Sequence, residues 1–552
     1  MNPKDINKYL YINKTPTWLV RAIYGLGILC WIPVVYGYWL FMESGPFYTW
    51  FFLPIVIFFT LYYVNSYAIN IFYKRLNLKK HTALIENYWQ NIKEEPSVDI
   101  FLPICGESVK VLENTCKAVE DIPYKNKKVY ILDDKGGSEY SDLAKKFDFE
   151  YLSRPNKGEM KKAGNLKYGF ERSNGEFIVI FDADFAPHPD FIKELVPYMQ
   201  DENTAIIQTP QFFDTSEKVH RRSPLEYGAS HIQEDFYRSI QVARDSLGAP
   251  ICCGSNALYR RAALAEIGGA AQIEHSEDMY TGFKLMLKDW KVRYLPIILA
   301  VGICPDNIHQ YFHQQQRWCS GTLLLMFDRS FWTSKLTFGQ KMCFISGFMY
   351  YLSYPLAILL SFQGFIIIFY YPGSISIFSA LPFIPTMLFS AIVLPLYRIS
   401  EPRIGNFVAR SAHSYAYYHA MLTTMFKSSV GWKVTNSKKV SVSGEFVHVT
   451  IFAACYLFIY IVLIALSVKK AGSTLLNPNF LLILYWIGFN LLSIIVILLE
   501  FYYVVRKGKR EEIRDGKLTR KGFVFWQAKT VGPYIVLLAV VIGAIVIFPI
   551  HI

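Results

Sequence analysis

The sequence lacks the cysteine patterns that organise zinc-binding and disulfide-rich proteins. Its nine cysteines are scattered over 552 residues, and no Cys-x-x-Cys pair occurs. The adjacent residues Cys252 and Cys253 suit neither an ordinary disulfide nor a zinc knuckle. We therefore expect reduced thiols in a cytosol-facing or membrane-buried setting.

Two further motifs are absent. No Gly-x-Gly-x-x-Gly follows the first expected strand of the polar region, and the Gly-x-Gly at residues 25–27 lies inside an apolar run. A nicotinamide-type Rossmann domain is therefore disfavoured. Residues 1–16 are polar and have no obvious cleavage site, and the apolar run after them is too long for a signal-peptide core.

Charge and hydropathy instead indicate a membrane protein. Hydrophobic residues make up 52% of the chain, the mean hydropathy is +0.22, and 57 Lys and Arg against 44 Asp and Glu leave a net charge of +13. In membrane proteins such an excess lies on the cytoplasmic side, where it meets anionic lipid. Nucleic acid is the rival explanation of a basic chain. The long apolar runs argue against it, and we expect no nucleic-acid partner.

About seven apolar runs approach or exceed the roughly 20 residues needed to cross a bilayer. They cover residues 17–41, 46–73, 343–371, 374–398, 447–468, 480–505 and 531–550. Basic residues flank the first two runs and fill an expected loop from Arg506 to Lys521. Their charge places the two flanks and this loop in the cytoplasm. We therefore predict a multi-pass plasma-membrane protein with a cytoplasmic catalytic domain and an external C-terminus.

Between the runs the pattern predicts one α/β domain with a largely parallel sheet. The expected strands are 98–103, 128–133, 149–153, 177–182 and 204–209. Amphipathic segments at 308–328 and 404–431 suit the membrane interface better than a crossing. The predicted order is an N-terminal region with two spans (1–94), a cytosolic domain (95–305), interface helices (306–340), spans (341–400), an interface helix with a loop (401–446) and C-terminal spans (447–552).

The stretch from Phe177 to Asp184 carries the first sign of chemistry. Its apolar part is typical of a buried strand, and Asp182 and Asp184 follow at the carboxyl end, where open α/β sheets bind ligands. Two carboxylates suit Mg²⁺ that is shared with substrate phosphates. A solvated turn is the alternative, because Asp-x-Asp also occurs by chance.

Other polar motifs follow along the chain, and their order resembles that of a known family. They are Glu107, Asp133-Asp134, Ser276-Glu277-Asp278 and Gln314-x-x-Arg317-Trp318, with the shorter words Lys162–Leu166, Gln208–Phe213, Cys253–Asn256 and Trp432–Thr435 between and after them. As an ordered set, this resembles the processive family 2 glycosyltransferases of the cellulose-synthase-like branch, whose marks are D,D,D and QxxRW. The resemblance covers about residues 95–440 and the membrane arrangement.

The resemblance implies a cytosolic GT-A nucleotide-sugar transferase domain, inserted in an α-helical transmembrane bundle with amphipathic interface helices. The implied uridine-binding residues are Glu107, Asp133 and Asp134. The implied diphosphate-binding residues are Lys162 and Arg317, through charge-assisted hydrogen bonds. Asp182 and Asp184 would coordinate Mg²⁺ or Mn²⁺, which offsets charge on the leaving oxygen.

By the same resemblance, Asp278 is the predicted general base. It would take the proton of the acceptor hydroxyl while that oxygen attacks the anomeric carbon opposite the leaving group, an assistance worth about 10²–10⁴-fold. A single base and in-line displacement invert the anomer, so an α-linked donor gives a β-linked product. The alternative is a first-turn acid that the helix dipole favours. Ser276 replaces the Thr that is usual in the family and keeps its hydroxyl.

The remaining predicted substrate-binding residues are Cys253, Gly254, Glu277, Gln314, Trp318, Trp432, Thr435 and Lys438. The indole of Trp318 offers an apolar face to a sugar ring, although an ordinary interfacial tryptophan is the alternative. The segment around Trp432 resembles a gating loop, but Trp432 replaces Phe and Lys438 falls one residue late. A basic run beside a membrane also serves as an anchor. Tyr350, Tyr351 and Tyr354 suit either a polysaccharide track or helix packing.

The sequence thus predicts a UDP-sugar-dependent inverting hexosyltransferase. It would polymerise glucose from UDP-glucose into a cellulose-like or mixed-linkage β-glucan and translocate the polymer, with the donor, the growing polysaccharide, membrane lipid and possible accessory export subunits as partners. The alternatives are a synthase of another β-linked polymer (mannan or an N-acetylhexosamine chain), a lipid glycosyltransferase that adds one sugar, and an export partner with an inactive domain. We expect no cyclic-di-GMP-sensing β-barrel after the last span.

Overall fold

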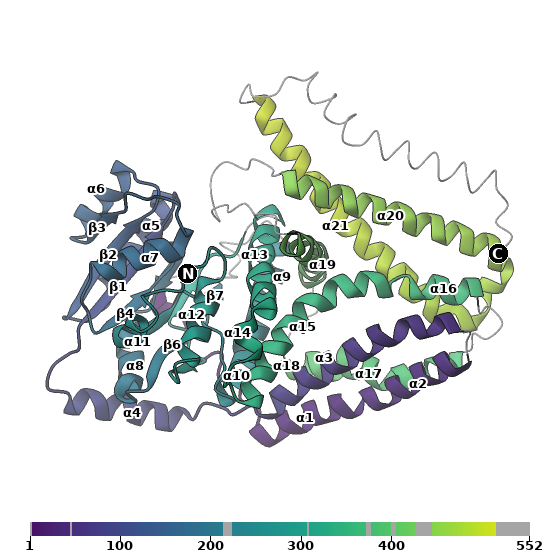
Figure 1. Cartoon of the computed structure of the whole chain (residues 1–552), viewed down its shortest axis with the longest axis horizontal. Coiled ribbons are helices and arrows are strands. Elements are labelled where there is room, and N and C mark those ends of the chain that lie inside the picture. The colour runs from purple at the N-terminus through teal and green to yellow at the C-terminus, as the bar shows by residue number, and fades with distance from the viewer. Residues whose placement is uncertain are drawn as a thin grey trace.

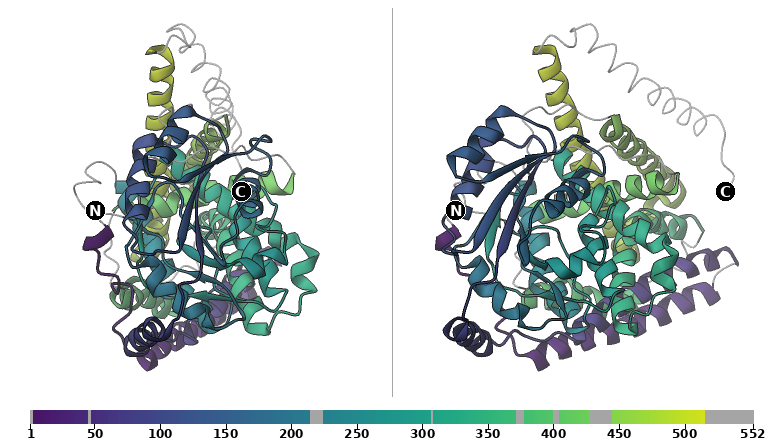
Figure 2. Two further views of the ribbon diagram at one scale, coloured as in Figure 1. Left: turned by 90° about the vertical axis from the view of Figure 1, so that its left-hand side faces the viewer. Right: turned by 60° about the vertical axis from the view of Figure 1, so that its left-hand side comes forward.

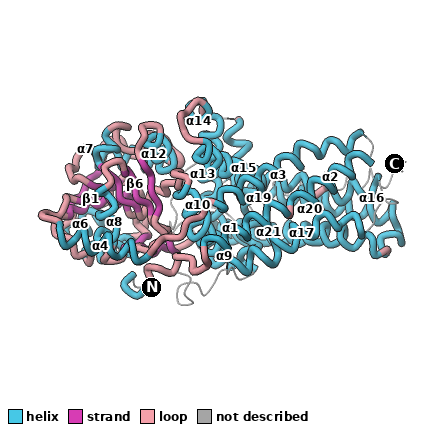
Figure 3. Tube along the Cα trace, turned by 90° about the horizontal axis from the view of Figure 1, so that it is seen from below, coloured by secondary structure: helices cyan, strands magenta, loops and turns pink. Residues whose placement is uncertain are grey.

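The computed structural model describes residues 3–44, 47–213, 224–305, 308–370, 377–398, 404–426 and 444–514. An α/β domain lies at one end of the molecule and a bundle of long helices at the other (Figures 1 and 3). A few helices from distant parts of the chain lie between them. This arrangement confirms the predicted fold class, an α/β domain combined with a bundle of helices.

The α/β domain contains a seven-stranded sheet of order β3-β2-β1-β4-β8-β6-β9. Its strands are β1 (Val98–Ile104), β2 (Lys127–Asp133), β3 (Glu150–Ser153), β4 (Phe177–Ile180), β6 (Thr204–Gln208), β8 (Ala257–Arg260) and β9 (Lys291–Tyr294). A small sheet of order β5-β10-β7 comprises β5 (Phe185–Pro187), β7 (Phe212–Phe213) and β10 (Ala300–Gly302). Every residue of β1 and β4 is buried, which explains their continuous apolar runs.

The prediction of a largely parallel sheet is confirmed, and β8 is the exception. This strand runs antiparallel to both of its neighbours, β4 and β6, so the sheet is mixed. The reason is visible in the register, where Gln208, the last residue of β6, pairs with Ala257, the first residue of β8. The chain leaves β6 and enters β8 at the same end of the sheet. Strand β8 must therefore run antiparallel to β6.

Helices cover both faces of the large sheet (Figure 2). On one face α5 (Val109–Glu120), α6 (Ser138–Lys146) and α8 (Phe191–Leu195) share a core with Ile100 and Leu102 of β1. On the other face α7 (Lys161–Glu171), α11 (Arg261–Ala265) and α12 (Glu277–Met286) share a core with Phe101. The side chains of successive residues of β1 thus pack on opposite faces of the sheet, as strand geometry requires.

The helical bundle contains the predicted membrane spans. Its helices are α1 (Thr17–Leu29), α2 (Trp31–Ser44), α3 (Leu53–Ile71), α15 (Phe338–Leu360), α16 (Gln363–Tyr370), α17 (Ile384–Leu388), α18 (Leu394–Arg398), α20 (Gly444–Ala471) and α21 (Leu481–Arg514). Within the described ranges, six helical stretches are long and apolar enough to cross a membrane. They coincide with the first six predicted spans, whereas the predicted span 531–550 lies outside the described residues.

One boundary of the bundle differs from the prediction. The basic segment expected to form a loop from Arg506 is helical as far as Arg514, as the continuation of α21 (Figure 1). The rest of the predicted loop, to Lys521, lies outside the described residues.

The helices between domain and bundle are α9 (Pro224–Asp235), α10 (Gln241–Ser246), α13 (Ile308–Phe327), α14 (Arg329–Trp332) and α19 (Ile404–Met425). Helix α19 packs against α9, α13 and α15. Polar pairs join α13 to α19: the Tyr311 hydroxyl lies 2.6 Å from Nε2 of His413, and the Tyr417 hydroxyl donates to Gln315 at 2.7 Å. Neither α13 nor α19 is among the six candidate spans, which fits the predicted amphipathic segments.

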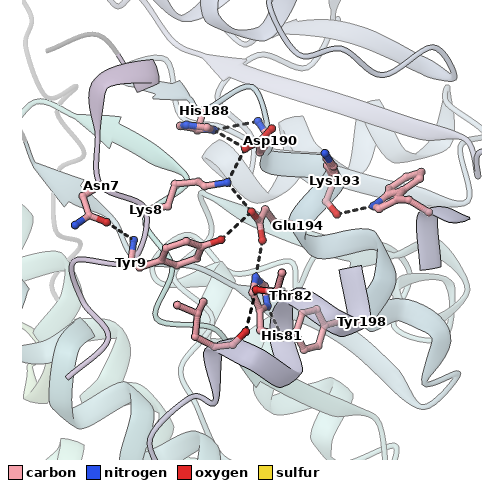
Figure 4. A network of polar contacts seen from close by, with 12 residues as sticks. Asn7, Lys8, Tyr9, His81, Thr82, His188, Asp190, Lys193, Glu194 and Tyr198 are labelled. Atoms are coloured by element: carbon pink, nitrogen blue, oxygen red, sulfur yellow. Dashed lines mark hydrogen bonds and ion pairs between the residues drawn. The ribbon is translucent and has the colours of Figure 1, made fainter. Parts of the chain in front are cut away.

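A polar network ties the N-terminal segment and α4 (Leu78–Asn91) to the α/β domain (Figure 4). The ammonium of Lys8 lies 2.6 Å from carboxylates of both Asp190 and Glu194. The other oxygen of Glu194 lies 2.6 Å from Nε2 of His81, on α4. Farther along the segment, Asn13 donates to the Tyr397 hydroxyl of α18 at 3.0 Å. The segment therefore bridges the domain and the bundle.

Candidate active site

The predicted donor-binding side chains meet at the carboxyl ends of β1, β2 and β4. Asp182 follows β4, and Lys162, near the start of α7, donates a hydrogen bond to its Oδ1. The same ammonium lies 4.0 Å from Oε1 of Glu277, at the start of α12. Burial would lower the pKa of Lys162, but the charges of Asp182 and Glu277 outweigh burial and raise it. A protonated Lys162 therefore joins two elements that are distant in sequence.

Asp184 lies in a region of excess negative charge. Burial, together with the charges of Asp182 and Glu107, raises the pKa of Asp184 to about 7. Clustered carboxylates of this kind suit a hard divalent cation. Within the described ranges no group of three or more His, Cys, Asp or Glu is placed to hold a metal ion. A role of Asp182 and Asp184 in holding a cation stays a prediction.

The predicted base, Asp278, lies in the first turn of α12. Its Oδ1 accepts the N–H of Met279 at 2.7 Å, and its Oδ2 faces Gly254, where an added methyl would lie 2.8 Å away. Burial raises the pKa of Asp278 to about 7, and the charge of Glu277 adds to this effect. Gly254 has φ +76°, a conformation that favours glycine, so this position both permits the turn and makes room for the carboxylate.

Helix α13 brings the QxxRW residues to the same place. Burial lowers the pKa of Arg317, and the charges of Glu277 and Asp182 partly offset this effect. Helix α13 approaches α12 closely at Gly321, where an added methyl would overlap the side chain of Ser276. Gln314 and Trp318 are half-buried on the same helix.

The three predicted uridine-binding residues make internal hydrogen bonds. An oxygen of Glu107 accepts the N–H of Cys105 at 2.5 Å. Asp133, at the end of β2, accepts two backbone N–H groups at 2.8 Å and the Tyr151 hydroxyl at 2.7 Å. Asp134 forms a buried ion pair with Arg154. Their role toward uridine stays a prediction.

The structure also shows residues to which the sequence assigned no role. Arg154, paired with Asp134, donates to the carbonyl of Glu159 at 2.6 Å and so holds the loop that leads into α7 and Lys162. Gln208 accepts the N–H of Cys253 at 2.7 Å. Gln208 begins one of the motifs that resemble the family, which was a usable signal, whereas no local pattern marks Arg154.

Some of the other predicted residues lie outside the described ranges, and the tyrosines of α15 contact α19. Trp432, Thr435 and Lys438 are among those outside. Tyr351 and Tyr354 of α15 pack edge-on against Tyr417 of α19, with ring centroids 4.8 and 5.3 Å apart. These contacts are those of helix packing, and a role as a polysaccharide track stays a prediction.

Comparisons with known proteins show which sequences and structures the chain is similar to. Residues 99–268 match the sequence model described as Glycosyl transferase family 2. The cellulose synthase 1 catalytic subunit [UDP-forming] of Komagataeibacter xylinus is 32% identical over 289 residues, which are 50% of this chain and 39% of that protein. The cellulose synthase catalytic subunit [UDP-forming] of Pseudomonas fluorescens is 30% identical over 263 residues, 47% of this chain and 36% of that one.

The chain thus covers less than two fifths of the length of either relative. Among solved structures, a mannosyltransferase from Pyrobaculum calidifontis in complex with GDP-Man and Mn²⁺ superposes with a TM-score of 0.45 and 15% identity, over 67% of this chain and 100% of that one. Residues 99–268 are thus similar to family 2 glycosyltransferases, and about half of the chain is similar to bacterial cellulose synthase catalytic subunits.

Proposed function

We propose that the protein is a processive, inverting synthase that polymerises glucose from UDP-glucose into a β-glucan and translocates the polymer across the plasma membrane. The observation that carries this proposal is the position of Arg317. This residue belongs to α13, between domain and bundle, yet it interacts electrostatically with Glu277 and Asp182 of the α/β domain. Helix α13 also packs at Gly321 against Ser276, just before α12, so this helix would border the donor site.

Donor binding would use charges that the site already holds in place. Lys162 and Arg317 would donate charge-assisted hydrogen bonds to the diphosphate, in part replacing their contacts with Asp182 and Glu277. Asp182 and Asp184 would hold Mg²⁺ or Mn²⁺, which supplies Lewis-acid stabilisation of the leaving UDP when bound. Glu107, Asp133 and Asp134 would line the uridine side.

The chemical step would depend on Asp278. With its pKa raised to about 7, this carboxylate is a stronger base than an ordinary aspartate and can still be ionised at neutral pH. It would accept the proton of the acceptor hydroxyl as that oxygen forms a bond to the anomeric carbon and the bond to UDP breaks. The proton neutralises the carboxylate, and the charge of the leaving group faces Lys162 and Arg317.

The acceptor side would include Cys253, Gly254, Gln314 and Trp318. The half-buried indole of Trp318 lies one residue after Arg317, so a sugar ring stacked on it would lie beside the donor site. Six candidate spans among the described residues provide the membrane bundle through which a polymer would leave. A catalytic domain in the cytoplasm is supported by the basic flanks of the first two spans.

The test is a polymerisation assay on the purified full-length protein. Radiolabelled UDP-glucose and Mg²⁺ are expected to yield a high-molecular-weight product that a β-glucanase digests. UDP-N-acetylglucosamine and GDP-mannose, assayed in parallel, separate the glucan from the other β-linked polymers. A short product that extracts with lipid would select single addition instead, and linkage analysis of any polymer would identify the acceptor hydroxyl.

A further inference from the structure

The turn at residues 251–256 lies between the two halves of the proposed site. On one side, the Ser255 hydroxyl accepts the N–H of Asp182 at 2.9 Å. On the other side, Gly254 faces Asp278 so closely that a methyl on the glycine would lie 2.8 Å from both Cβ and Oδ2 of the aspartate. The position of this turn therefore controls the distance between the donor-binding strand end and the predicted base.

A single buried amide holds this turn from behind. Oε1 of Gln208 accepts the N–H of Cys253 at 2.7 Å, and Nε2 donates to the carbonyl of Ser255 at 2.7 Å, so the side chain spans Gly254. Nε2 also donates to the carbonyl of Thr209 at 2.8 Å, and the residue is fully buried. A buried amide without these partners is costly, so the bonded arrangement strongly favours one position of the turn.

Two other glutamines brace the ends of the turn. Gln241 of α10 accepts the N–H of Ile251 at 2.9 Å and donates to its carbonyl at 2.7 Å. Gln211 donates to the carbonyl of Cys253 at 3.2 Å. Of the three side chains, Gln208 is the one whose bonds reach the residues on both sides of Gly254. It is therefore the amide with most control over the space that Asp278 occupies.

We propose that Gln208 is a positioning residue for glycosyl transfer, because it holds the 251–256 turn and thereby sets the separation of Asp182 and Asp278. The inference rests on the proposed function and names a residue that acts through the turn, without touching the substrate. A shift of about 1 Å in a reacting group can cost about 10²-fold in rate. Loss of the amide is thus expected to lower kcat about 10- to 100-fold.

The test compares Gln208→Met, which keeps the length of the side chain and removes its amide, with Gln90→Met on the exposed surface of α4. Both are assayed as full-length protein with UDP-glucose and Mg²⁺. For Gln208→Met we expect the lower kcat, a KM for UDP-glucose and a Kd for UDP within about twofold of the parent, and a larger share of UDP released without polymer growth. Gln90→Met is expected to match the parent.

Each other outcome overturns the inference. An unchanged kcat shows that the amide does not position the site, and a joint loss of UDP binding and thermal stability assigns Gln208 to the folding of the domain. If Gln208→Met does not fold, Gln208→Glu, which keeps the shape without the amide donor, replaces it. Failure of both variants to fold likewise assigns Gln208 to the folding of the domain. An inactive parent overturns the proposed function together with this inference, whereas an active parent with an unaffected Gln208→Met overturns this inference alone.

Discussion

At the scale of single residues, the site is a set of carboxylates held close together by two cations. Asp184 and Asp278 both have a pKa raised to about 7, each first by burial and then by a neighbouring carboxylate. Lys162 and Arg317 face the same group of charges. Perturbed carboxylates of this kind cluster at functional sites, and in the proposed function they would divide between donor binding and proton transfer.

Replacing the predicted base tests this division. In Asp278→Asn the amide cannot accept the acceptor proton, so UDP release with acceptor present is expected to fall by about 10²–10⁴-fold. UDP affinity, measured by titration calorimetry with Mg²⁺, is expected to change little, because the donor contacts lie elsewhere. Glu274→Gln is the matched control, since Glu274 is an exposed carboxylate of the same loop that pairs with Lys161 at 3.0 Å. Retained turnover in Asp278→Asn would exclude it as the base.

The raised pKa of Asp278 also predicts a pH profile. Below about pH 7 the pair Glu277 and Asp278 holds an additional proton, and a protonated base cannot act. The value of kcat/KM is therefore expected to fall about tenfold per unit as the pH drops below 7, and to level off above it. Protonation of Asp184 competes with metal binding, so an acid limb due to Asp184 would move to lower pH as Mg²⁺ is raised. A limb that moves in this way would contradict the assignment to Asp278.

The order of motifs along the chain predicted several of the site residues. Asp182, Lys162 and Arg317 belong to motifs that resemble the family, and the structure brings them together. The pairing of Arg154 with Asp134 could not be predicted, because a loop of irregular backbone decides it. Gly321 is similar, since its need for a small side chain depends on how α13 packs on Ser276.

At the scale of elements, strands were predictable where burial is complete. β1 and β4 gave apolar runs and lie within a residue or two of their predicted bounds. The antiparallel direction of β8 was not predictable. It depends on the position at which the chain returns to the sheet after β6, α9 and α10. The same path produces the 251–256 turn, so the unpredicted strand direction and the proposed positioning residue have one cause.

Helix α8 is the element on which the next prediction depends. Burial opposes ionisation of Glu194, but hydrogen bonds from His81 and Lys8 outweigh burial and lower its pKa to about 2. Because the folded pKa is depressed below the ordinary value of 4.5, this carboxylate stabilises the fold above about pH 4.5. The contribution is lost as the pH falls from there toward 2.

Glu194→Gln is therefore expected to lower stability at pH 7 by about 2–4 kcal/mol, because Lys8 and His81 lose the charged partner they share. Thermal melting of the detergent-solubilised protein measures this, with Glu86→Gln on the exposed surface of α4 as control. The variant is also expected to lose less stability than the parent between about pH 5 and pH 4. Equal acid sensitivity of the two proteins would contradict the assigned role of Glu194.

At the scale of the whole molecule, one chain contains an α/β domain and a bundle of candidate membrane spans, with α13 and α19 between them. Hydropathy predicted the bundle, since six predicted runs correspond to the six candidate spans of the described residues. Hydropathy could not predict that α13 and α19 are held to each other by side-chain hydrogen bonds such as Tyr417 to Gln315. Under the proposed function, such pairing would connect the donor site to the bundle.

The linkage of synthesis to export gives the last prediction. UDP-glucose is charged and does not cross a bilayer, so inside-out membrane vesicles are expected to make polymer from external UDP-glucose, whereas sealed right-side-out vesicles are not. If the chain emerges through the bundle, the product will collect in the lumen and resist added glucanase until detergent opens the vesicle. Vesicles with Asp278→Asn give the background. A product digested without detergent would show that synthesis occurs without translocation, and activity in sealed right-side-out vesicles would contradict a cytoplasmic catalytic domain.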